Sequence, residues 1–403
     1  MLDSQRRQAI ATEILVVGAG LAGLAAALAF AEAGFETILC GAPERLANGR
    51  TVALLDGSMR FFERLGLRAE IERRGAPLKG LRLIDDADSL WRAPTVEFRA
   101  GEIGLEAFGW NVENAALIEA LAADAARRAR LTLIGRRVSA YEWDQGRALA
   151  HCDDGRTIAA LLVVAADGRD SPARLAADIP IRTHRLPQTA LTTILSHRRP
   201  HQDFSTEFHT RSGPFTLVPL PPAEGEAHRS SLVWVMTHSA ARRRMALDDG
   251  NLAAEIEAQA QSIHGAMRIA GGRGAFPLVA QTARRLTAPR LALIGDAAHV
   301  APPIGAQGLN LGLRDAAHLI EAAAQAKAIG ADIGGAAALA RYEARRRGDV
   351  MTRAAAVNAL NLSLIAGLTP LHMLRGAGLA ALNAFGPLRR LVMREGVEPH
   401  LFA

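Results

Sequence analysis

The sequence predicts a mixed α/β protein in which a parallel α/β unit is interrupted by a second β-sheet and followed by a helical C-terminal region. Three observations support this fold class. A short apolar run at 14–17 leads through a glycine-rich turn into an Ala- and Leu-rich segment at 21–33. Strand-like alternation fills 188–220, and from Gly308 onward the pattern is almost entirely helical.

Composition excludes several other classes of protein. With 403 residues, of which 49% are hydrophobic and 22% charged, the chain matches a globular protein of two or three domains. Its two cysteines cannot form a disulfide framework or a four-ligand zinc site, and they favour a reducing, cytoplasmic environment. The net charge of +6 favours anionic partners, whereas 4% aromatic residues argue against a base-stacking reader of nucleic acid.

The N-terminal region has the pattern of a βαβ unit. The run 14–17 suits a buried parallel strand, 21–33 a helix, and 36–40 a second strand. Residues 14–31 carry no charge and follow two arginines, so a membrane span or an export signal is the alternative. Glycines near the start of this stretch favour a strand, a turn and a helix instead.

The glycine-rich turn GAGLAG, residues 18–23, lies between the first strand and the helix. Gly18 allows a tight turn, Gly20 lets a pyrophosphate approach the backbone, and Gly23 lets the helix pack closely on the strand. Phosphates then lie at the helix N-terminus, where unpaired N–H groups and the helix dipole favour negative charge. The unit is therefore predicted to be a Rossmann-like dinucleotide site.

The acidic residue that binds ribose hydroxyls in such sites is missing from its expected place. About 20 residues after the glycines, at the end of the second strand, the sequence has Gly41. Glu44 from the following loop, a backbone group or water are the three alternatives for this contact.

The later segments indicate that the chain leaves the first sheet and returns to it. Strands are predicted within 188–220 and 230–237, a helix at 252–264, a strand at 276–287 and a buried apolar strand at 291–294.

Two further motifs follow predicted strands. The strand 161–166 runs into ADGRDSPAR, which contains Asp167 and Arg174. The strand 291–294 runs into GDAAHVAPPIGAQGLNLGLRD, which begins at Gly295. Each motif places an Asp beside a Gly at the carboxyl end of a strand, the edge at which open α/β sheets bind ligands.

In this order and at these separations, the three motifs resemble the fingerprints of the FAD-dependent aromatic hydroxylases, the group A flavoprotein monooxygenases. Several segments resemble the ubiquinone-biosynthesis branch: RTVAL followed by Ser58, 65–67, 112–114, and the C-terminal runs YEARRRGDV and GLAALNAFGPLRRLVMREG. Two features depart from the pattern of that branch: Gly41, and the segment from Pro302 to Ala306, which is closer to that of hydroxybenzoate hydroxylases.

The resemblance implies a division of the chain. A Rossmann-like FAD-binding domain would comprise 1–75, 100–180 and 280–345. A β-sheet substrate domain would comprise 76–99 and 181–279. A helical C-terminal region would comprise 346–403.

The resemblance also implies how FAD is held. Asp296 would bond the ribityl chain, the segment 303–310 would wrap the isoalloxazine, and Arg50 would lie near the phosphates or the ring. Asp167 and Arg174 would brace the cofactor. For both aspartates, capping of a helix is an alternative role that is compatible with cofactor binding. The residues expected to bind FAD are Gly18, Gly20, Leu21, Ala22, Gly23, Arg50, Asn114, Asp167, Arg174, Gly295, Asp296, Pro303, Gly305, Gly308, Leu309 and Asn310.

The implied activity is hydroxylation of a phenolic, polyprenylated ring in ubiquinone biosynthesis, with O2 and a flavin hydroperoxide as the oxygen donor. The sequence has no second GxGxxG, so the reductant is NADH, NADPH or a protein donor. No side chain is assigned as catalytic: His299 is either a general base or a hydrogen-bonded structural histidine. No metal site is expected, because neither HxH nor HExxH spacing occurs. The alternatives are a flavin dehydrogenase or prenyl reductase, and a non-enzymatic flavin-stabilised subunit.

The C-terminal region has two interpretations. Leu360, Leu364, Leu368 and Leu371 recur at near-helical spacing, and Arg375, Arg389, Arg390 and Arg394 follow. The segment either packs against the body or a partner subunit, as in a homo-oligomer or a biosynthetic complex, or forms a peripheral contact with the inner face of a membrane.

Overall fold

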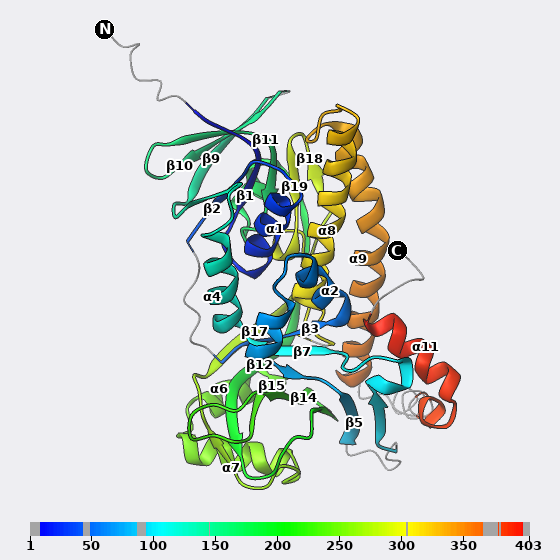
Figure 1. Ribbon diagram of the computed structural model, residues 1–403. Coiled ribbons are helices and arrows are strands. Elements are labelled where there is room, and N and C mark those ends of the chain that lie inside the picture. The colour runs from blue at the N-terminus through cyan, green and yellow to red at the C-terminus, as the bar shows by residue number, and fades with distance from the viewer. Residues whose placement is uncertain are drawn as a thin grey trace.

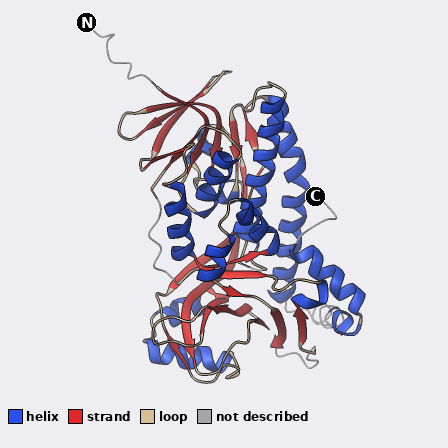
Figure 2. Cartoon of the chain, viewed as in Figure 1, coloured by secondary structure: helices blue, strands red, loops and turns tan. Residues whose placement is uncertain are grey.

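A computed structural model describes residues 9–42, 49–86, 94–144, 146–303, 305–365, 378 and 380–397. In these residues two large sheets dominate, one at each end of the molecule, with long helices beside the first (Figure 1). Figure 2 shows that most helices gather around the first sheet and that the other end is mainly strands. The mixed α/β class with an inserted sheet and a helical C-terminus is confirmed.

The first sheet contains eight of the described strands, in the order β18-β19-β11-β1-β2-β8, with β10 and β9 extending from β11. Its central strands pair in parallel, with Ile14 opposite both Leu162 and Thr37. The strands are β1 (Ile10–Val17), β2 (Thr37–Cys40), β8 (Leu131–Ile134), β9 (Val138–Trp143), β10 (Ala148–Cys152), β11 (Thr157–Ala165), β18 (Thr287–Ala288) and β19 (Leu291–Leu293).

Helices cover this sheet because their apolar residues need a partner surface. Helix α1 (Leu21–Glu32) is buried along most of its length and contacts α4 (Asn114–Ala125) and α8 (Gln307–Ala328). Helix α9 (Ala336–Ile365) runs beside α8 (Figure 1). The parallel strands are apolar on both faces, as expected for a sheet with helices on its faces.

The second sheet contains nine of the described strands, in the order β20-β17-β12-β15-β14-β13-β5-β6, with β16 beside β12. Residues 76–99 supply β5 and β6, so this early segment joins the sheet built mainly by 181–283. The strands are β5 (Gly80–Asp86), β6 (Val96–Arg99), β12 (Ile181–His197), β13 (Phe204–Thr210), β14 (Gly213–Leu220), β15 (Arg229–Thr237), β16 (Met267–Ile269), β17 (Gly274–Ala283) and β20 (His299–Val300).

The two faces of the second sheet differ in what covers them. Leu191 and Trp234 form a buried cluster with residues of α6 (His238–Met245) and α7 (Asp249–Gln259). Because side chains alternate along a strand, Ala190 and Val235 point to the opposite face. We call this opposite face the inner face, since Ser231 on it bonds to the first half of the molecule, its hydroxyl lying 2.9 Å from that of Thr51.

A small third sheet and short helices join the two halves. Strands β3 (Thr51–Leu55), β7 (Gly109–Glu113) and β4 (Ala76–Pro77) form the sheet. From β7, the Asn111 side chain donates to Pro219 O at 2.8 Å, which anchors β7 to β14. The short helices are α2 (Asp56–Arg64), α3 (Arg68–Arg74), α5 (Pro172–Ala176) and the 3-10 turns η1 (Ala100–Ile103) and η2 (Gly295–Ala297).

The last described helix, α11 (Gly386–Val397), packs on the edge of the second sheet. Met393 is buried against Val96 and Phe98, and Arg389 bonds to Glu102 at 2.7 Å. Within the described residues, no helix combines the length and the apolar character that crossing a membrane requires.

Two predicted elements differ from the observed ones. The helix expected at 252–264 ends at Gln259, because Gln261 and Ser262 have positive φ angles of 52° and 50°. The strand expected at 276–287 is two strands, β17 and β18, which belong to different sheets. The division into domains at the residue numbers given above stays a prediction.

Candidate cofactor and substrate site

The glycine-rich turn leaves open space where a phosphate would lie. Gly18 has φ +103°, and a Cβ there would come within 2.3 Å of Ala166 O, so only glycine fits between β1 and β11. A Cβ on Gly23 would lie 1.8 Å from Gly18 O. By contrast, a Cβ on Gly20 would meet no atom within 4 Å, and no side chain caps the helix that begins after it. The turn is thus tight on the protein side and open at the helix N-terminus, as a pyrophosphate requires.

The backbone at Gly41 explains the missing acidic residue. Its φ is +147°, and a Cβ would lie 2.9 Å from the backbone nitrogen of Ala19. An Asp or Glu would collide there with the glycine-rich turn. Glu44, one candidate substitute, lies outside the described residues.

The three motifs meet at one edge of the first sheet. Ala166, at the start of the second motif, contacts the Gly18 position of the first. Gly295, the first residue of the third motif, packs against Ala22 of α1. A Cβ on Gly295 would lie 3.3 Å from the Cβ of Ala22. Arg174 of the second motif donates to Ala297 O of the third at 2.9 Å. Segments more than 100 residues apart in sequence therefore form one continuous surface.

In the second motif, Asp167 and Arg174 both carry an unused polar atom. Asp167 Oδ2 accepts from Ala173 N at 3.0 Å, whereas Oδ1 is buried without a partner in the described structure. Arg174 also donates to Arg169 O, and its Nε has no partner there. Burial raises the pKa of Asp167 and lowers that of Arg174. The capping contact to Ala173 coexists with a free carboxylate oxygen.

Asp296 lies in η2 within reach of several cations. Solvent contacts its side chain, yet protein crowds it closely enough that desolvation raises the pKa of its carboxyl. His299, Arg50 and Arg169 oppose that rise by their charges. Arg50 also lies over the Phe276 ring, 5.2 Å from its centroid, on the inner face of the second sheet. Asp296 and Arg50 thus occupy the junction between the two sheets.

The segment before α8 is held by the side chain of Asn310. Its Oδ1 accepts from Leu55 N at 3.0 Å and Ser58 Oγ at 2.6 Å, and its Nδ2 donates to Ala53 O at 2.8 Å. A further bond to Ala306 O at 2.5 Å completes the set. The amide of Asn310 is therefore used inside the protein, and any cofactor contact from this residue belongs to its backbone.

The remaining predicted site residues line the same region. Gly305 has φ +65°, Gly308 has open space beside it, and no side chain caps α8. Asn114 N donates to Arg50 O at 3.0 Å, and Asn114 Oδ1 is buried without a partner in the described residues. Leu21 and Leu309 pack on the first core, and Pro303 lies in a bend next to Ile304, which is outside the described residues.

A buried ion network lies behind this surface, and although His299 and Asp315 belong to the third motif, the sequence does not show that they pair with each other or with Arg346. Asp315 Oδ2 accepts from Gly295 N at 2.9 Å and from His299 Nε2 at 2.7 Å, and Oδ1 accepts from Arg346 Nε at 2.7 Å. Both Asp315 and Arg346 are 0% exposed. The charges of His299 and Arg346 hold the pKa of Asp315 well below its usual range, although burial opposes them. Of the two roles considered for His299, the structure supplies the hydrogen-bonded one.

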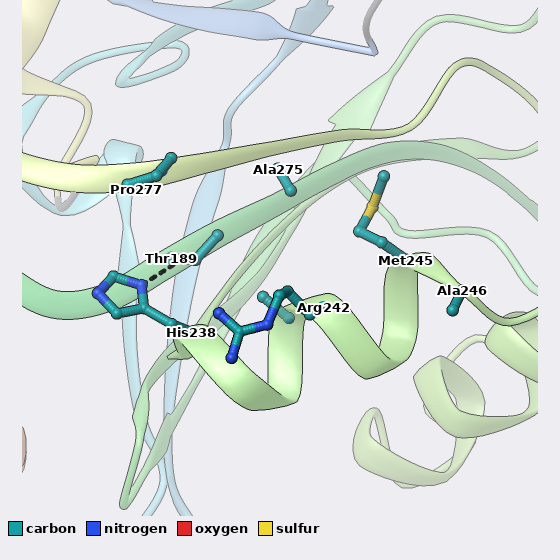
Figure 3. A pocket seen from close by; sticks show the side chains of 8 residues that line it. Thr189, His238, Arg242, Met245, Ala246, Ala275 and Pro277 are labelled. Atoms are coloured by element: carbon teal, nitrogen blue, oxygen red, sulfur yellow. Dashed lines mark hydrogen bonds between the residues drawn. The ribbon is translucent and has the colours of Figure 1, made fainter.

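The described residues also line an open cavity of about 840 Å³ beneath α6 (Figure 3). Thr189 bonds to His238 there at 2.8 Å, and Ala275 and Pro277 line the strand side. Because Phe276 lies between the last two residues, it points to the other face of β17. The cavity is therefore on the outer face, away from Arg50 and Asp296.

The inner face provides an apolar floor opposite the three motifs. Leu186, Ala190, Val235 and Leu278 form a buried cluster on it. Phe276 and Arg50 lie at one side of this floor.

Comparison with known proteins identifies the family of the chain. The family model described as FAD binding domain matches residues 11–356. Ubiquinone hydroxylase UbiL of Rhodospirillum rubrum is 34% identical, with 96% of this chain and 89% of that protein covered. 3-Demethoxyubiquinol 3-hydroxylase of Escherichia coli is 29% identical over 95% of this chain and 97% of its own length.

Solved structures show the same fold at lower identity. p-Nitrophenol 4-monooxygenase PnpA of Pseudomonas putida has a TM-score of 0.78 at 17% identity, covering 96% of this chain and 98% of that one. A point variant of HpxO from Klebsiella pneumoniae, solved with FAD, has a TM-score of 0.76 at 21% identity, covering 97% of this chain and all of that one.

The site fits FAD on its own residues. The open space at Gly20, the buried oxygen of Asp167 that has no partner in the described structure, and the N-terminus of α8 without a side-chain cap are features that suit a dinucleotide and an electron-rich ring. The chain belongs to the FAD binding domain family, in the ubiquinone hydroxylase branch of the FAD-dependent aromatic hydroxylases, and its cofactor is FAD.

Proposed function

We propose that this enzyme hydroxylates the phenolic ring of a polyprenylated ubiquinone precursor, with O2 and NAD(P)H as cosubstrates. The observation that carries the proposal is the match, along 96% of the chain, to a ubiquinone hydroxylase. The apolar cluster on the inner face supports it, because sites for neutral aromatic rings are lined mainly by apolar side chains.

Different residues of the chain would bind and orient different parts of FAD. The N-terminus of α1 would bind the pyrophosphate at Gly20, and Asp296 would bond the ribityl chain. The N-terminus of α8 would stabilise negative charge on the reduced ring, because its first N–H groups have no side-chain cap. When bound, reduced FAD supplies the oxygen chemistry. The second sheet would exclude water from the ring.

The reductant is tested by stoichiometry. With a short-tailed phenol, O2 and either NADH or NADPH, we expect one hydroxylated product for each reduced nicotinamide consumed. Consumption of neither nicotinamide, together with turnover on a reduced iron–sulfur protein, would identify a protein donor instead. Product without a new hydroxyl group would favour the dehydrogenase or reductase alternative.

We also propose that α11 contacts an anionic membrane surface from which a long-tailed substrate is collected. Phe385, Leu391 and Val392 are 60%, 52% and 45% exposed, and Leu388 is 38% exposed. Arg390 and Arg394 are exposed beside them. Basic residues next to exposed apolar ones suit the interface of an anionic bilayer.

The structure changes which arginines belong to this surface. Arg389 bonds to Glu102 and is half-buried, so it anchors α11 to η1 rather than facing outward. Leu360 and Leu364 lie on α9, but their side chains are outside the described residues, as are Leu368, Leu371 and Arg375.

Vesicle flotation tests the membrane contact. The Arg390→Gln/Arg394→Gln double variant should bind vesicles containing phosphatidylglycerol more weakly than wild type, and salt should weaken wild-type binding. Arg127→Gln serves as a control, because Arg127 follows α4 beside the first sheet and its side chain is 72% exposed. If the wild-type protein does not bind such vesicles at low salt, the membrane contact is refuted and α11 instead packs against a partner subunit or a biosynthetic complex.

A further inference from the structure

A buried imidazole and a partly buried carboxylate lie together on the inner face of the second sheet. Glu207 and His209 are two residues apart on β13, so both side chains point to one face. Glu207 is opposite Thr216 of β14, which in turn is opposite Val233 of β15. Val233 is two residues from Ser231, whose hydroxyl meets Thr51. The pair therefore lies on the inner face, two strands across from the contact with the first half.

The contacts of Glu207 fix the tautomer of His209. Glu207 Oε1 lies 2.9 Å from His209 Nε2, and Oε2 accepts from Thr216 Oγ1 at 3.2 Å. A carboxylate only accepts hydrogen bonds, so the proton of the neutral imidazole is on Nε2. The lone pair is then on Nδ1. This is the arrangement in which a carboxylate orients a histidine for proton transfer.

Nδ1 is the atom that nothing else uses. His209 is 3% exposed, and Nδ1 is buried without a hydrogen-bond partner in the described structure. Buried polar atoms are nearly always paired, so an unpaired one calls for a specific explanation. The Nδ1 lone pair would accept a hydrogen bond from water or from the hydroxyl group of a ligand.

The apolar floor connects the pair to the cofactor side. Val235 lies opposite Ala190, and Ala190 lies opposite Phe276, under Arg50. On β14, Phe215 is opposite Trp234, so the preceding residue, Pro214, lies next to Val235. Pro214 is in turn opposite His209 of β13. One row of inner-face positions thus runs from Phe276 to His209.

We propose that Glu207 and His209 form the general base that ionises the substrate's phenolic hydroxyl. This inference rests on the proposed function and names the proton acceptor for it. The phenol O–H bond breaks, an Nδ1–H bond forms, and the products are a phenolate and an imidazolium whose charge Glu207 stabilises. A phenolate ring donates electrons more strongly than a phenol, so it reacts faster with an electrophilic oxygen.

Asp85 and Arg211 are charged residues that lie close to the pair in strand register or in sequence. Asp85 of β5 is the register partner of His209 and is 7% exposed. Arg211 lies exposed at the β13–β14 turn.

The test compares the ionisation of a bound phenol in the FAD-loaded enzyme and its variants. A short-tailed methoxyphenol is titrated into wild type, His209→Gln and Glu207→Gln across pH, and the ultraviolet difference spectrum reports phenolate. Wild type should bind phenolate well below the pKa of free phenol, about 10. His209→Gln should bind neutral phenol until the pH approaches that value, and its hydroxylation rate should fall about 10²- to 10⁴-fold, with recovery at high pH.

A matched control comes from the other half of the molecule. His151 Nε2 lies 2.9 Å from Glu142 Oε1, and His151 Nδ1 lies 3.1 Å from Thr157 Oγ1, on exposed strands of the first sheet. His151→Gln should leave the phenol spectrum and the pH profile unchanged. FAD content should be the same in all variants.

Each outcome bears on one claim. Phenolate bound by His209→Gln as it is by wild type, with hydroxylation intact, would overturn the base assignment and leave the proposed function standing. Phenolate bound by wild type but not by His209→Gln, with no hydroxylation by wild type, would support the base and overturn the proposed function. If His209→Gln does not fold, Glu207→Gln decides: its phenol ionisation must move to higher pH, and an unchanged spectrum would refute the proposal.

Discussion

Replacing Asp315 should damage both stability and the cofactor surface, because one carboxylate serves three buried partners. It accepts from Gly295 N, His299 Nε2 and Arg346 Nε at 2.7–2.9 Å. Gly295 is the first residue of η2, and His299 is the first residue of β20, which follows η2. The bonds to Asp315 therefore fix both ends of the turn that carries Asp296. Arg174 fixes the middle of that turn through Ala297 O.

The expected cost follows from burial. Asp315 and Arg346 are 0% exposed, and removing one partner of a buried ion pair costs about 3–5 kcal/mol. Asp349 stays bonded to Arg346 at 2.5 Å, so the lower part of this range applies. Asp315→Asn keeps an oxygen for Gly295 N or His299 but loses the charge, and should cost about 1.5–3 kcal/mol.

Urea denaturation of the FAD-free and FAD-loaded proteins measures both effects. Asp315→Ala should lower the free energy of unfolding in both forms and should also weaken FAD binding, since the turn at Asp296 loses two anchors. The Asp315→Leu/Arg346→Leu double variant should lose less than the sum of the single changes, because neither Asp315 nor Arg346 is then left buried without the other. Additive losses, or normal stability of Asp315→Ala, would refute the network.

The other predictions concern the cofactor contacts and pH. Asp296→Ala should weaken FAD binding by roughly 10- to 150-fold, the value of a charged hydrogen bond, and unchanged affinity in titrations of the folded variant would remove Asp296 from the site. Gly20→Ala should fold normally yet bind FAD weakly, because its Cβ meets no protein atom within 4 Å. Gly18→Ala should be unstable even without FAD, because its Cβ would lie 2.3 Å from Ala166 O. Equal melting temperatures for the two variants would contradict this. Burial lowers the pKa of His197 to about 4 and of His264 to about 3. Both therefore stay neutral in the folded state while the unfolded chain takes up protons below pH of about 6.5, so stability present at pH 7 should be lost as the pH falls toward 4. Urea midpoints of wild type and His264→Leu measured from pH 7 to pH 5 check this, and an equal fall in both would exclude His264 as a cause.

Local pattern was enough for the elements that surround the cofactor. Apolar runs bounded by glycine located β1, β11 and β19, and the GAGLAG turn located the start of α1. These signals are local because a buried parallel strand and a glycine-rich turn each require particular residues in sequence order. Gly41 departs from the dinucleotide-site pattern in the sequence, but the reason for the glycine, the approach of Ala19 N, is a contact across the fold.

The side-chain groups could not be predicted because their partners are far apart in sequence. Asp315 and Arg346 lie on α8 and α9, and each also reads as an ordinary exposed helix charge. Glu207 and His209 are neighbours on one strand, yet their burial and the contact with Thr216 depend on strand register. Periodicity gives the face on which a residue lies, but not what the neighbouring element places against it.

The origin of the oxygen in the product tests the central claim most directly. Purified FAD-loaded enzyme is supplied with a phenolic substrate, NAD(P)H and ¹⁸O2, and the product is analysed by mass spectrometry. The account predicts a ring hydroxyl that carries one ¹⁸O atom from O2. A product without ¹⁸O, or turnover that consumes no O2, would contradict assignment of this enzyme as a monooxygenase.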